Sequence, residues 1–288
     1  MSIKISGFAD EIDDNFENQL KGLKENNIEY IEVRGVNGKN ISILNRDELN
    51  EAKKLLDLYK IKVSAIGSPI GKIKITDDFD EHLKLFDNVM LAAEIFNTKY
   101  IRMFSFFIPE EDQKNNNYAK YRDEVMRRIG VLAKLAKQRN LILCHENEGN
   151  IYGESPELCL DIMQYFKGEV KLVFDPANFI VGGFVPYPHA YNLLAEHIEY
   201  IHVKDADETG ILPAGYGKGG FKEILSDLIL NKKFEGFLSI EPHLSVFTGL
   251  KELSGEDNIV VNKYNSKPEA FAAAAGALKK ILKDNSLV

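Results

Sequence analysis

The sequence predicts a single-domain (β/α)8 barrel, the fold also known as the TIM barrel. Short runs of Ile, Val, Leu and Phe alternate with longer amphipathic segments eight times, which indicates eight strand–helix units. The chain has 288 residues, and one barrel of this class commonly fills about 250 residues. No change in composition marks a linker, so we expect residues 1–288 to form one domain.

The eight apolar runs have the character of strands that are buried on both faces of a parallel sheet. They are brief and rich in branched and aromatic residues, with few charges before their last positions. In chain order they cover residues 3–7, 30–34, 62–67, 99–105, 141–146, 170–175, 200–204 and 236–241.

The segments between these runs have the spacing of amphipathic helices. They cover residues 16–25, 46–59, 78–96, 121–139, 156–166, 191–199, 221–231 and 267–283. The fifth has the clearest start signal, because Ser155 can cap its N-terminus and Pro156 occupies its first position.

Two features bear on the alternative of a doubly wound open sheet and on the organisation near the C-terminus. An open sheet would be expected to place G-x-G-x-x-G after the first strand, whereas the sequence here is Gly7-Phe8-Ala9-Asp10-Glu11. Residues 244–266 form a long polar connection before the last helix. Such a loop in a compact domain is usually functional, so we expect a lid or a partner-binding arm.

Composition and charge exclude several classes of protein. A net charge of −8 argues against a nucleic-acid-coating protein, although a few local cations could still bind a small anion. No run of 18 apolar residues occurs and no secretory segment opens the chain, so we expect no membrane span. Two cysteines, Cys144 and Cys159, are too few for a disulfide framework, which favours a reducing cytoplasm.

Ionisable residues stand where the last four apolar runs end. Glu146, Asp175, His202 and Glu241 occupy these positions, and the carboxyl ends of barrel strands form the active-site rim in this fold. Any one of them alone would more often face water or pair with a cation. Four at the same end predict a shared metal ion, since three carboxylates and an imidazole suit Mn²⁺ or Mg²⁺ and tolerate Zn²⁺ or Co²⁺.

Further polar residues near these strand ends are candidates for substrate binding. Lys204 follows His202 by two residues, so both side chains face the barrel axis. Some of the charged candidates could instead form only an ion-pair network, and a histidine beyond the last strand could simply pack in its loop. The candidates are Glu32, Arg34, Arg102, Asn178, Lys204 and His243.

Two other motifs have competing interpretations. His145 is adjacent to Glu146, so strand alternation directs it toward the helices and away from a metal site. The glycine-rich residues 215–220 precede a helix and could direct backbone N–H groups at a substrate phosphate. The same glycines could equally form a flexible entry to that helix.

At these residues the sequence resembles the xylose-isomerase-like TIM-barrel superfamily of sugar isomerases and epimerases, over essentially the whole chain. The matching segments are Gly7–Glu11, Tyr30–Arg34, Glu146-Asn147, Asp175-Pro176-Ala177-Asn178, His202-Val203-Lys204-Asp205 and Glu241-Pro242-His243. The resemblance implies one divalent ion held by the four strand-end residues, with Glu146 and Glu241 also acting as an acid/base pair. Asn178 and Glu208 stand where the ketose epimerases of this superfamily have His and Arg, so the resemblance does not specify the sugar.

Three functions follow from this pattern. The first is a metal-dependent isomerase or epimerase of a sugar or sugar phosphate, in which Glu146 removes a proton next to a carbonyl and Glu241 returns one through an enediolate. The second is a lyase that dehydrates a cyclic polyol or keto acid, and the third is a non-catalytic binding barrel. The endonuclease branch of the superfamily needs further His ligands, which the ends of strands two to four lack. A homo-oligomer is possible through residues 106–109 and 244–266.

Overall fold

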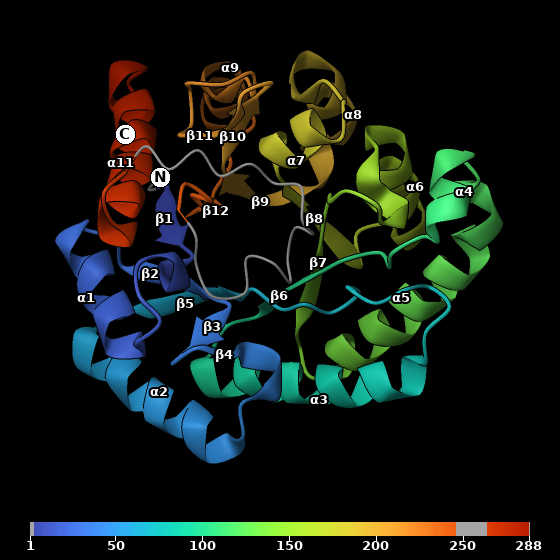
Figure 1. Cartoon of the computed structure of the whole chain (residues 1–288), viewed down its shortest axis with the longest axis horizontal. Coiled ribbons are helices and arrows are strands. Elements are labelled where there is room, and N and C mark those ends of the chain that lie inside the picture. The colour runs from blue at the N-terminus through green and yellow to red at the C-terminus, as the bar shows by residue number, and fades with distance from the viewer. Residues whose placement is uncertain (1–2, 246–263, 288) are drawn as a thin grey trace.

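Eight parallel strands form a nearly closed barrel that is surrounded by helices (Figure 1). The computed structural model describes residues 3–245 and 264–287. The barrel strands are β1 (Lys4–Gly7), β2 (Tyr30–Val33), β5 (Lys62–Ile66), β6 (Tyr100–Met103), β7 (Ile142–Glu146), β8 (Val170–Phe174), β9 (Ile198–Val203) and β12 (Phe237–Ile240). Each of the eight predicted strands is therefore present, with ends that differ by a few residues.

The strands follow the order β1-β12-β9-β8-β7-β6-β5-β2, and β2 returns to lie beside β1. Neighbouring strands pair in parallel, as in Gly7 opposite Ile240 and Glu146 opposite Val173. All carboxyl ends therefore meet at one rim of the barrel. Two short hairpins lie on the loops of this rim, β3 (Gly35–Val36) with β4 (Lys39–Asn40) and β10 (Asp205–Asp207) with β11 (Gly210–Leu212).

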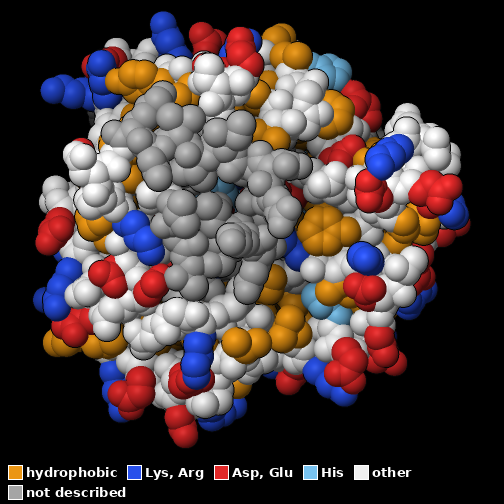
Figure 2. All heavy atoms as spheres, in the orientation of Figure 1, with side chains coloured by type: hydrophobic (Ala, Val, Ile, Leu, Met, Phe, Trp, Pro, Cys, Tyr) orange, Lys and Arg blue, Asp and Glu red, His pale blue; other side chains and the backbone are white. Residues whose placement is uncertain are grey.

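Helices follow the strands and cover the outside of the barrel. They are α1 (Phe16–Glu25), α2 (Arg46–Tyr59), α3 (Phe79–Phe96), α4 (Glu110–Lys114), α5 (Arg122–Gln138), α6 (Pro156–Phe166), α7 (Pro176–Val181), α8 (Tyr191–Leu194), α9 (Phe221–Ser226) and α11 (Lys267–Asp284). Figure 2 shows acidic and basic side chains interspersed over the outer helices of one face. Neither sign of charge dominates the outer part of that face.

Local signals explain where several helices begin. Ser155 Oγ accepts the N–H of Leu158 at 3.2 Å and Pro156 occupies the first position of α6, which confirms the predicted start. At α2, Asn45 and Glu48 form a reciprocal capping box. Such caps satisfy backbone N–H groups that have no partner inside the helix.

The prediction of a helix over 191–199 was wrong at its end. The structure has α8, then a 3-10 turn over Ala195–His197, and β9 already begins at Ile198. Ile198 pairs with Leu172 of β8, so the growing sheet takes residues that an amphipathic pattern alone assigned to the helix. Most of the predicted 244–266 connection, residues 246–263, lies outside the described residues.

Side chains inside the barrel change in character from one end to the other. Midway along the strands, Ala65, Cys144, Val173 and Tyr200 form a small buried apolar cluster, and Tyr100, Ile142 and Phe237 pack against it nearer the amino ends. A cavity of about 530 Å³ opens beyond it, at the mouth opposite the predicted site. Towards the carboxyl ends the inward side chains become ionisable, and the site described next occupies that half. In the described part of the chain, no helix is both long and apolar enough to cross a membrane.

Candidate metal centre

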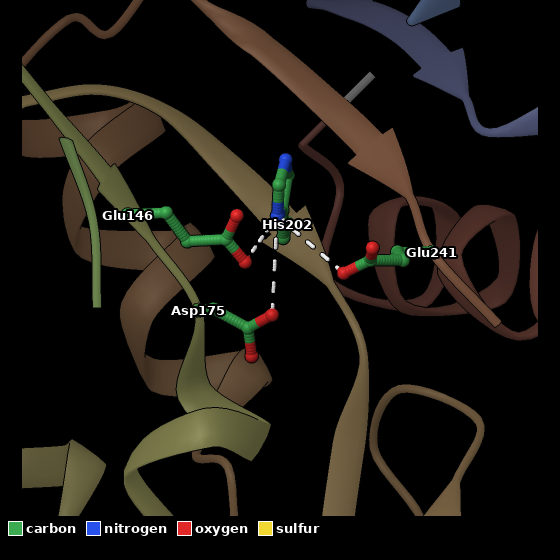
Figure 3. Close-up of side chains that lie close together, drawn as sticks. All are labelled: Glu146, Asp175, His202 and Glu241. Atoms are coloured by element: carbon green, nitrogen blue, oxygen red, sulfur yellow. Dashed lines mark hydrogen bonds and ion pairs between the residues drawn. The ribbon is translucent and has the colours of Figure 1, made fainter. Parts of the chain in front are cut away.

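Four ionisable side chains meet at the carboxyl ends of consecutive strands (Figure 3). Glu146 ends β7, Asp175 follows β8, His202 lies in β9 and Glu241 follows β12. Each offers one oxygen or ring nitrogen, and these atoms all lie within 4.8 Å of one another. All four residues are buried. We refer to them below as the acid–His cluster.

The His202 ring directs one nitrogen at all three carboxylates. Its Nδ1 lies 3.0 Å from Glu146 Oε1, 3.5 Å from Glu241 Oε2 and 3.9 Å from Asp175 Oδ2. Burial alone would lower the pKa of His202, but the carboxylates of Glu146 and Glu32 raise it to about 10. Without a metal ion, the imidazole is therefore protonated and supplies positive charge to the cluster.

Asp175 gives the clearest indication that the cluster fits a cation. Its Oδ2 is buried and accepts no hydrogen bond from the described residues, although Lys204 Nζ lies 3.0 Å away as an ion pair. Burial raises the pKa of Asp175 to about 7, and Lys204 opposes only part of that shift. Three carboxylates and an imidazole are ligands that suit Mn²⁺, Mg²⁺, Zn²⁺ or Co²⁺. The residues present therefore fit a divalent ion.

Lys204 lies against the cluster. Its Nζ is 2.9 Å from Glu241 Oε2 and 3.0 Å from Asp175 Oδ2, and the residue is buried. Burial would lower the pKa of Lys204, but Asp175 and Glu241 raise it above its ordinary value. The ammonium group is thus held between two of the candidate ligands, within reach of anything that binds beside them.

Two arginines fix the two glutamates of the cluster. Arg34 Nη1 donates to Glu241 Oε1 at 2.9 Å, and Arg102 Nη1 donates to Glu146 Oε2 at 3.1 Å. Both guanidinium groups also pack on the ring of Phe8, at 4.5 and 5.1 Å from its centre. The ion-pair network that the sequence left open for these arginines is present.

Arg34 has further partners on the loop after β1, which were not among the predicted site residues. Arg34 donates to Asp10 Oδ2 at 2.8 Å and to Glu11 Oε1 at 3.1 Å. Asp10 and Glu11 follow the end of the first strand. Their position is the same signal that identified the ionisable residues at the last four strand ends. Burial is the main cause that raises the pKa of Glu11 to about 8, with Arg34 opposing it.

His243 lies beside the acid–His cluster on the Glu241 side. Its Nε2 is 3.4 Å from Glu241 Oε1 and 3.6 Å from Glu11 Oε1, and its backbone N–H donates to Glu11 Oε2 at 2.7 Å. Burial and the charge of Lys204 lower the pKa of His243 to about 4, so its ring is neutral at pH 7. Glu11, Glu241 and His243 also lie within 4.8 Å of one another, but Arg34 already supplies positive charge to this group.

The remaining candidates lie around the cluster in different ways. Asn178 Nδ2 donates to Glu146 Oε1 at 3.2 Å and to the Asn147 carbonyl at 2.9 Å. Glu32 contacts the far side of the His202 ring, through Nε2 at 3.3 Å. His145 points outward, as predicted, and its ring bonds Ser105 Oγ at 2.9 Å.

The glycine-rich loop surrounds a carboxylate of the chain itself. Asp205 accepts the N–H groups of Gly215, Gly217 and Gly219 at 2.9, 3.0 and 2.8 Å. A Cβ at Gly217 would lie 2.4 Å from Asp205 Oδ1, so the close approach requires glycine there. Of the two alternatives left open for this loop, phosphate binding is not supported at these three amides, because the buried Asp205 already accepts their N–H groups.

Comparisons with solved structures identify the same barrel in proteins of low sequence identity. A probable 3-DHS dehydratase, AsbF from Bacillus anthracis, has a TM-score of 0.69 at 18% identity, covering 96% of this chain and 99% of its own. A xylose isomerase-like TIM barrel protein from Mycobacterium smegmatis, in complex with magnesium, has a TM-score of 0.67 at 17% identity, covering 94% and 89%. D-allulose 3-epimerase from Methylomonas sp., in complex with D-allulose, has a TM-score of 0.70 at 13% identity, covering 96% of each chain.

Sequence comparison then assigns the family. Among curated proteins, none has a sequence that matches this chain significantly. The family model described as xylose isomerase-like TIM barrel matches residues 20–280. The chain therefore belongs to the xylose isomerase-like TIM barrel family.

Proposed function

We propose that this protein is a divalent-metal-dependent isomerase or epimerase that acts on a sugar. One observation supports the proposal above the others: two buried glutamates, Glu146 and Glu241, approach His202 from opposite sides (Figure 3). Each is held by its own arginine, so each carboxylate has a fixed direction. An epimerase needs such a pair, because a proton leaves one face of a carbon and another arrives on the opposite face.

The charges around the glutamates suit these two roles. Burial opposes ionisation of Glu146, but His202 and Arg102 lower its pKa to about 2, so this side chain is a carboxylate that can accept a proton. Burial also opposes ionisation of Glu241, but Lys204, His243 and His202 lower its pKa well below the ordinary value. Glu241 is therefore a carboxylate at neutral pH, like Glu146, and it must first take up a proton before it can return one to the substrate.

The metal ion would be held by the acid–His cluster. When bound, it would stabilise the negative charge that develops on two adjacent substrate oxygens. Lys204, His243 and Asn178 border the cluster and would orient substrate hydroxyls, while Arg34 and Arg102 hold the two glutamates. The magnesium and the D-allulose seen in related barrels support an ion and a small sugar as ligands.

The structure favours a sugar over a sugar phosphate in one respect. The amides that could have bound a phosphate donate to Asp205 instead. A neutral polyhydroxy ketone needs no such site, because hydroxyl groups can be bound by Lys204, His243 and Asn178. We therefore propose an unphosphorylated ketose as the substrate class.

The test is proton exchange from D₂O into a panel of ketoses and ketose phosphates, with Mn²⁺ and with chelator. Glu241→Gln should lower the rate by about 10²–10⁴-fold, the usual contribution of a positioned acid or base. The matched control is Glu199→Gln, the same substitution at the opposite end of the barrel, where Glu199 pairs with the Tyr100 hydroxyl. Full activity in Glu241→Gln, or exchange that survives the chelator, contradicts the proposal.

Product mass separates the alternative reaction. A dehydratase on this scaffold would begin with the same proton removal but would expel hydroxide, and a probable dehydratase has a barrel of the same fold. Isomers keep the mass of the substrate, whereas dehydration removes one water. A product lighter by one water would replace the isomerase proposal with the lyase.

A further inference from the structure

Glu32 is a buried carboxylate that the proposed reaction does not use. It lies on β2, and its side chain is fully buried. The ladder between β2 and β5 shifts register between Ile31 and Glu32, so a local irregularity sets the position of this residue. Because a buried charge is costly unless it is bonded, the partners of Glu32 indicate its purpose.

The partners of Glu32 come from two other strands and account for both of its oxygens. Ser239 of β12 donates its hydroxyl to Oε2 at 2.6 Å, and Tyr200 of β9 donates its hydroxyl to Oε1 at 3.0 Å. His202 Nε2 lies 3.3 Å from Oε2 and 3.4 Å from Oε1. The carboxylate is thus held in place by two hydroxyls and is directed at one imidazole nitrogen. Both of its oxygens already have partners, which favours the ion-pair alternative for Glu32 over a contact with substrate.

The His202 ring therefore has a carboxylate on each of its nitrogens. Nδ1 faces the acid–His cluster, with Glu146 Oε1 at 3.0 Å, and Nε2 faces Glu32 on the other side. The ring of Phe8 packs edge-on against the imidazole at a centre distance of 5.1 Å, which restricts its rotation. Histidines that bind metals usually donate the other ring N–H to a carboxylate or carbonyl, which fixes the tautomer and makes the ligating nitrogen more basic.

We infer that Glu32 is a positioning residue for the metal centre: it accepts a hydrogen bond from the Nε2–H of His202 and so presents Nδ1 to the cation. This inference depends on the proposed metal centre and adds an outer carboxylate to it. Ser239 and Tyr200 serve the same purpose one contact further away, since they hold Glu32 in place. Glu32 does not touch the substrate and is not a catalytic residue.

The first test measures cation affinity in the absence of substrate. Mn²⁺ titrated calorimetrically into Glu32→Gln should bind about 10–100-fold more weakly than into the wild-type protein, the usual effect of losing an outer-shell carboxylate. Ser239→Ala, which keeps the Glu32–His202 contact, should show a smaller loss. Glu199→Gln, a control at the opposite end of the barrel, should bind as tightly as the wild type. Equal affinity in Glu32→Gln and wild type overturns the inference.

The second test uses no variant at Glu32, so its result does not depend on whether Glu32→Gln folds correctly. Long-range ¹H–¹⁵N spectra of the Zn²⁺-loaded protein report which imidazole nitrogen holds the proton, with His202 assigned from His202→Asn. The expected pattern is a protonated Nε2 and a metal-bound Nδ1. Zinc on Nε2 overturns the inference.

The two proposals fail in different ways. If the wild-type protein binds neither Mn²⁺ nor Zn²⁺, the metal centre itself is wrong, and the proposed function falls with the role of Glu32. If the wild type binds these ions and Glu32→Gln binds them equally well, only the role of Glu32 is wrong.

Discussion

Two buried aspartates at the same rim of the barrel have opposite surroundings. Asp205 lies in the glycine-rich loop and accepts four backbone N–H groups, those of Ala206, Gly215, Gly217 and Gly219. Asp175, at the end of β8, accepts a single backbone N–H, that of Asn178, through Oδ1 and otherwise lies among charged side chains. Its Oδ2 accepts no hydrogen bond from the part of the chain that the structure describes.

The difference separates a carboxylate that stabilises a loop from one that we propose binds a cation. Burial raises the pKa of both aspartates, but backbone amides oppose the shift at Asp205, whereas Asp175 depends on the charge of Lys204. Backbone amides are fixed donors, so the Asp205 carboxylate needs no bound ion to satisfy it. The carboxylates of the acid–His cluster repel one another, and a proton or a bound cation would relieve the repulsion that Lys204, Arg34 and Arg102 leave. The comparison can be tested by changing each aspartate in turn.

The largest expected effect is on cation binding. Removing a residue that only supports a ligand typically weakens metal binding by about 10–100-fold. Asp175→Asn should weaken Mn²⁺ binding by more than this, because it removes a candidate ligand itself. Asp205→Asn should leave the affinity unchanged. Calorimetric titration of both variants checks this, and a comparable loss from Asp205→Asn would erase the distinction between the two sites.

The next effect is on stability and should have the opposite order. Asp205→Ala should lower the free energy of unfolding by at least about 2 kcal/mol, because hydrogen bonds to charged groups contribute about 1.5–3 kcal/mol each. Asp175→Asn should cost the metal-free protein little, since it removes one of three buried like charges. Urea denaturation in the presence of chelator measures both, and a larger loss from Asp175→Asn would contradict the comparison.

The third effect is a dependence of the affinity for Mn²⁺ on pH. A cation that binds Nδ1 must displace the proton of His202, whose pKa is raised to about 10 by neighbouring carboxylates. Mn²⁺ affinity should therefore increase between pH 7 and 9 by up to about tenfold per unit, with about one proton released per ion. Titrations in buffers of different ionisation enthalpy measure that proton. Binding that is independent of pH would be inconsistent with His202 as a ligand.

The same shift affects the metal-free protein with a definite sign. A raised pKa means that the folded state binds the His202 proton more tightly than the unfolded chain does. This contribution to stability is complete below about pH 6.5, the ordinary pKa of histidine, and is lost as the pH rises to about 10. In Asp205→Asn, the free energy of unfolding should still decrease as the pH rises from about 6.5 to about 10. In His202→Asn, this decrease should be absent.

The fold could be predicted from the sequence because strand and helix periods are local signals. The convergence of Glu146, Asp175, His202 and Glu241 was also predictable, since a parallel barrel gathers all strand ends at one rim. Other contacts depend on how distant loops fold back. The glycines of residues 215–220 close on Asp205, and no spacing rule distinguishes that arrangement from a phosphate site. Glu32 was placed on the correct face, but the direction of its carboxylate depends on a register shift that hydrophobic patterning does not reveal.

Strand β9 supplies three inward residues at intervals of two: Tyr200, which supports Glu32, then His202, then Lys204 just beyond the strand. Because side chains alternate along a strand, deleting one residue before Tyr200 would turn all three toward the helices together. An insertion or deletion within β9 would therefore displace three residues of the site at once, whereas a substitution changes one. Alignments of its natural variants should show gaps on either side of this strand and none within it.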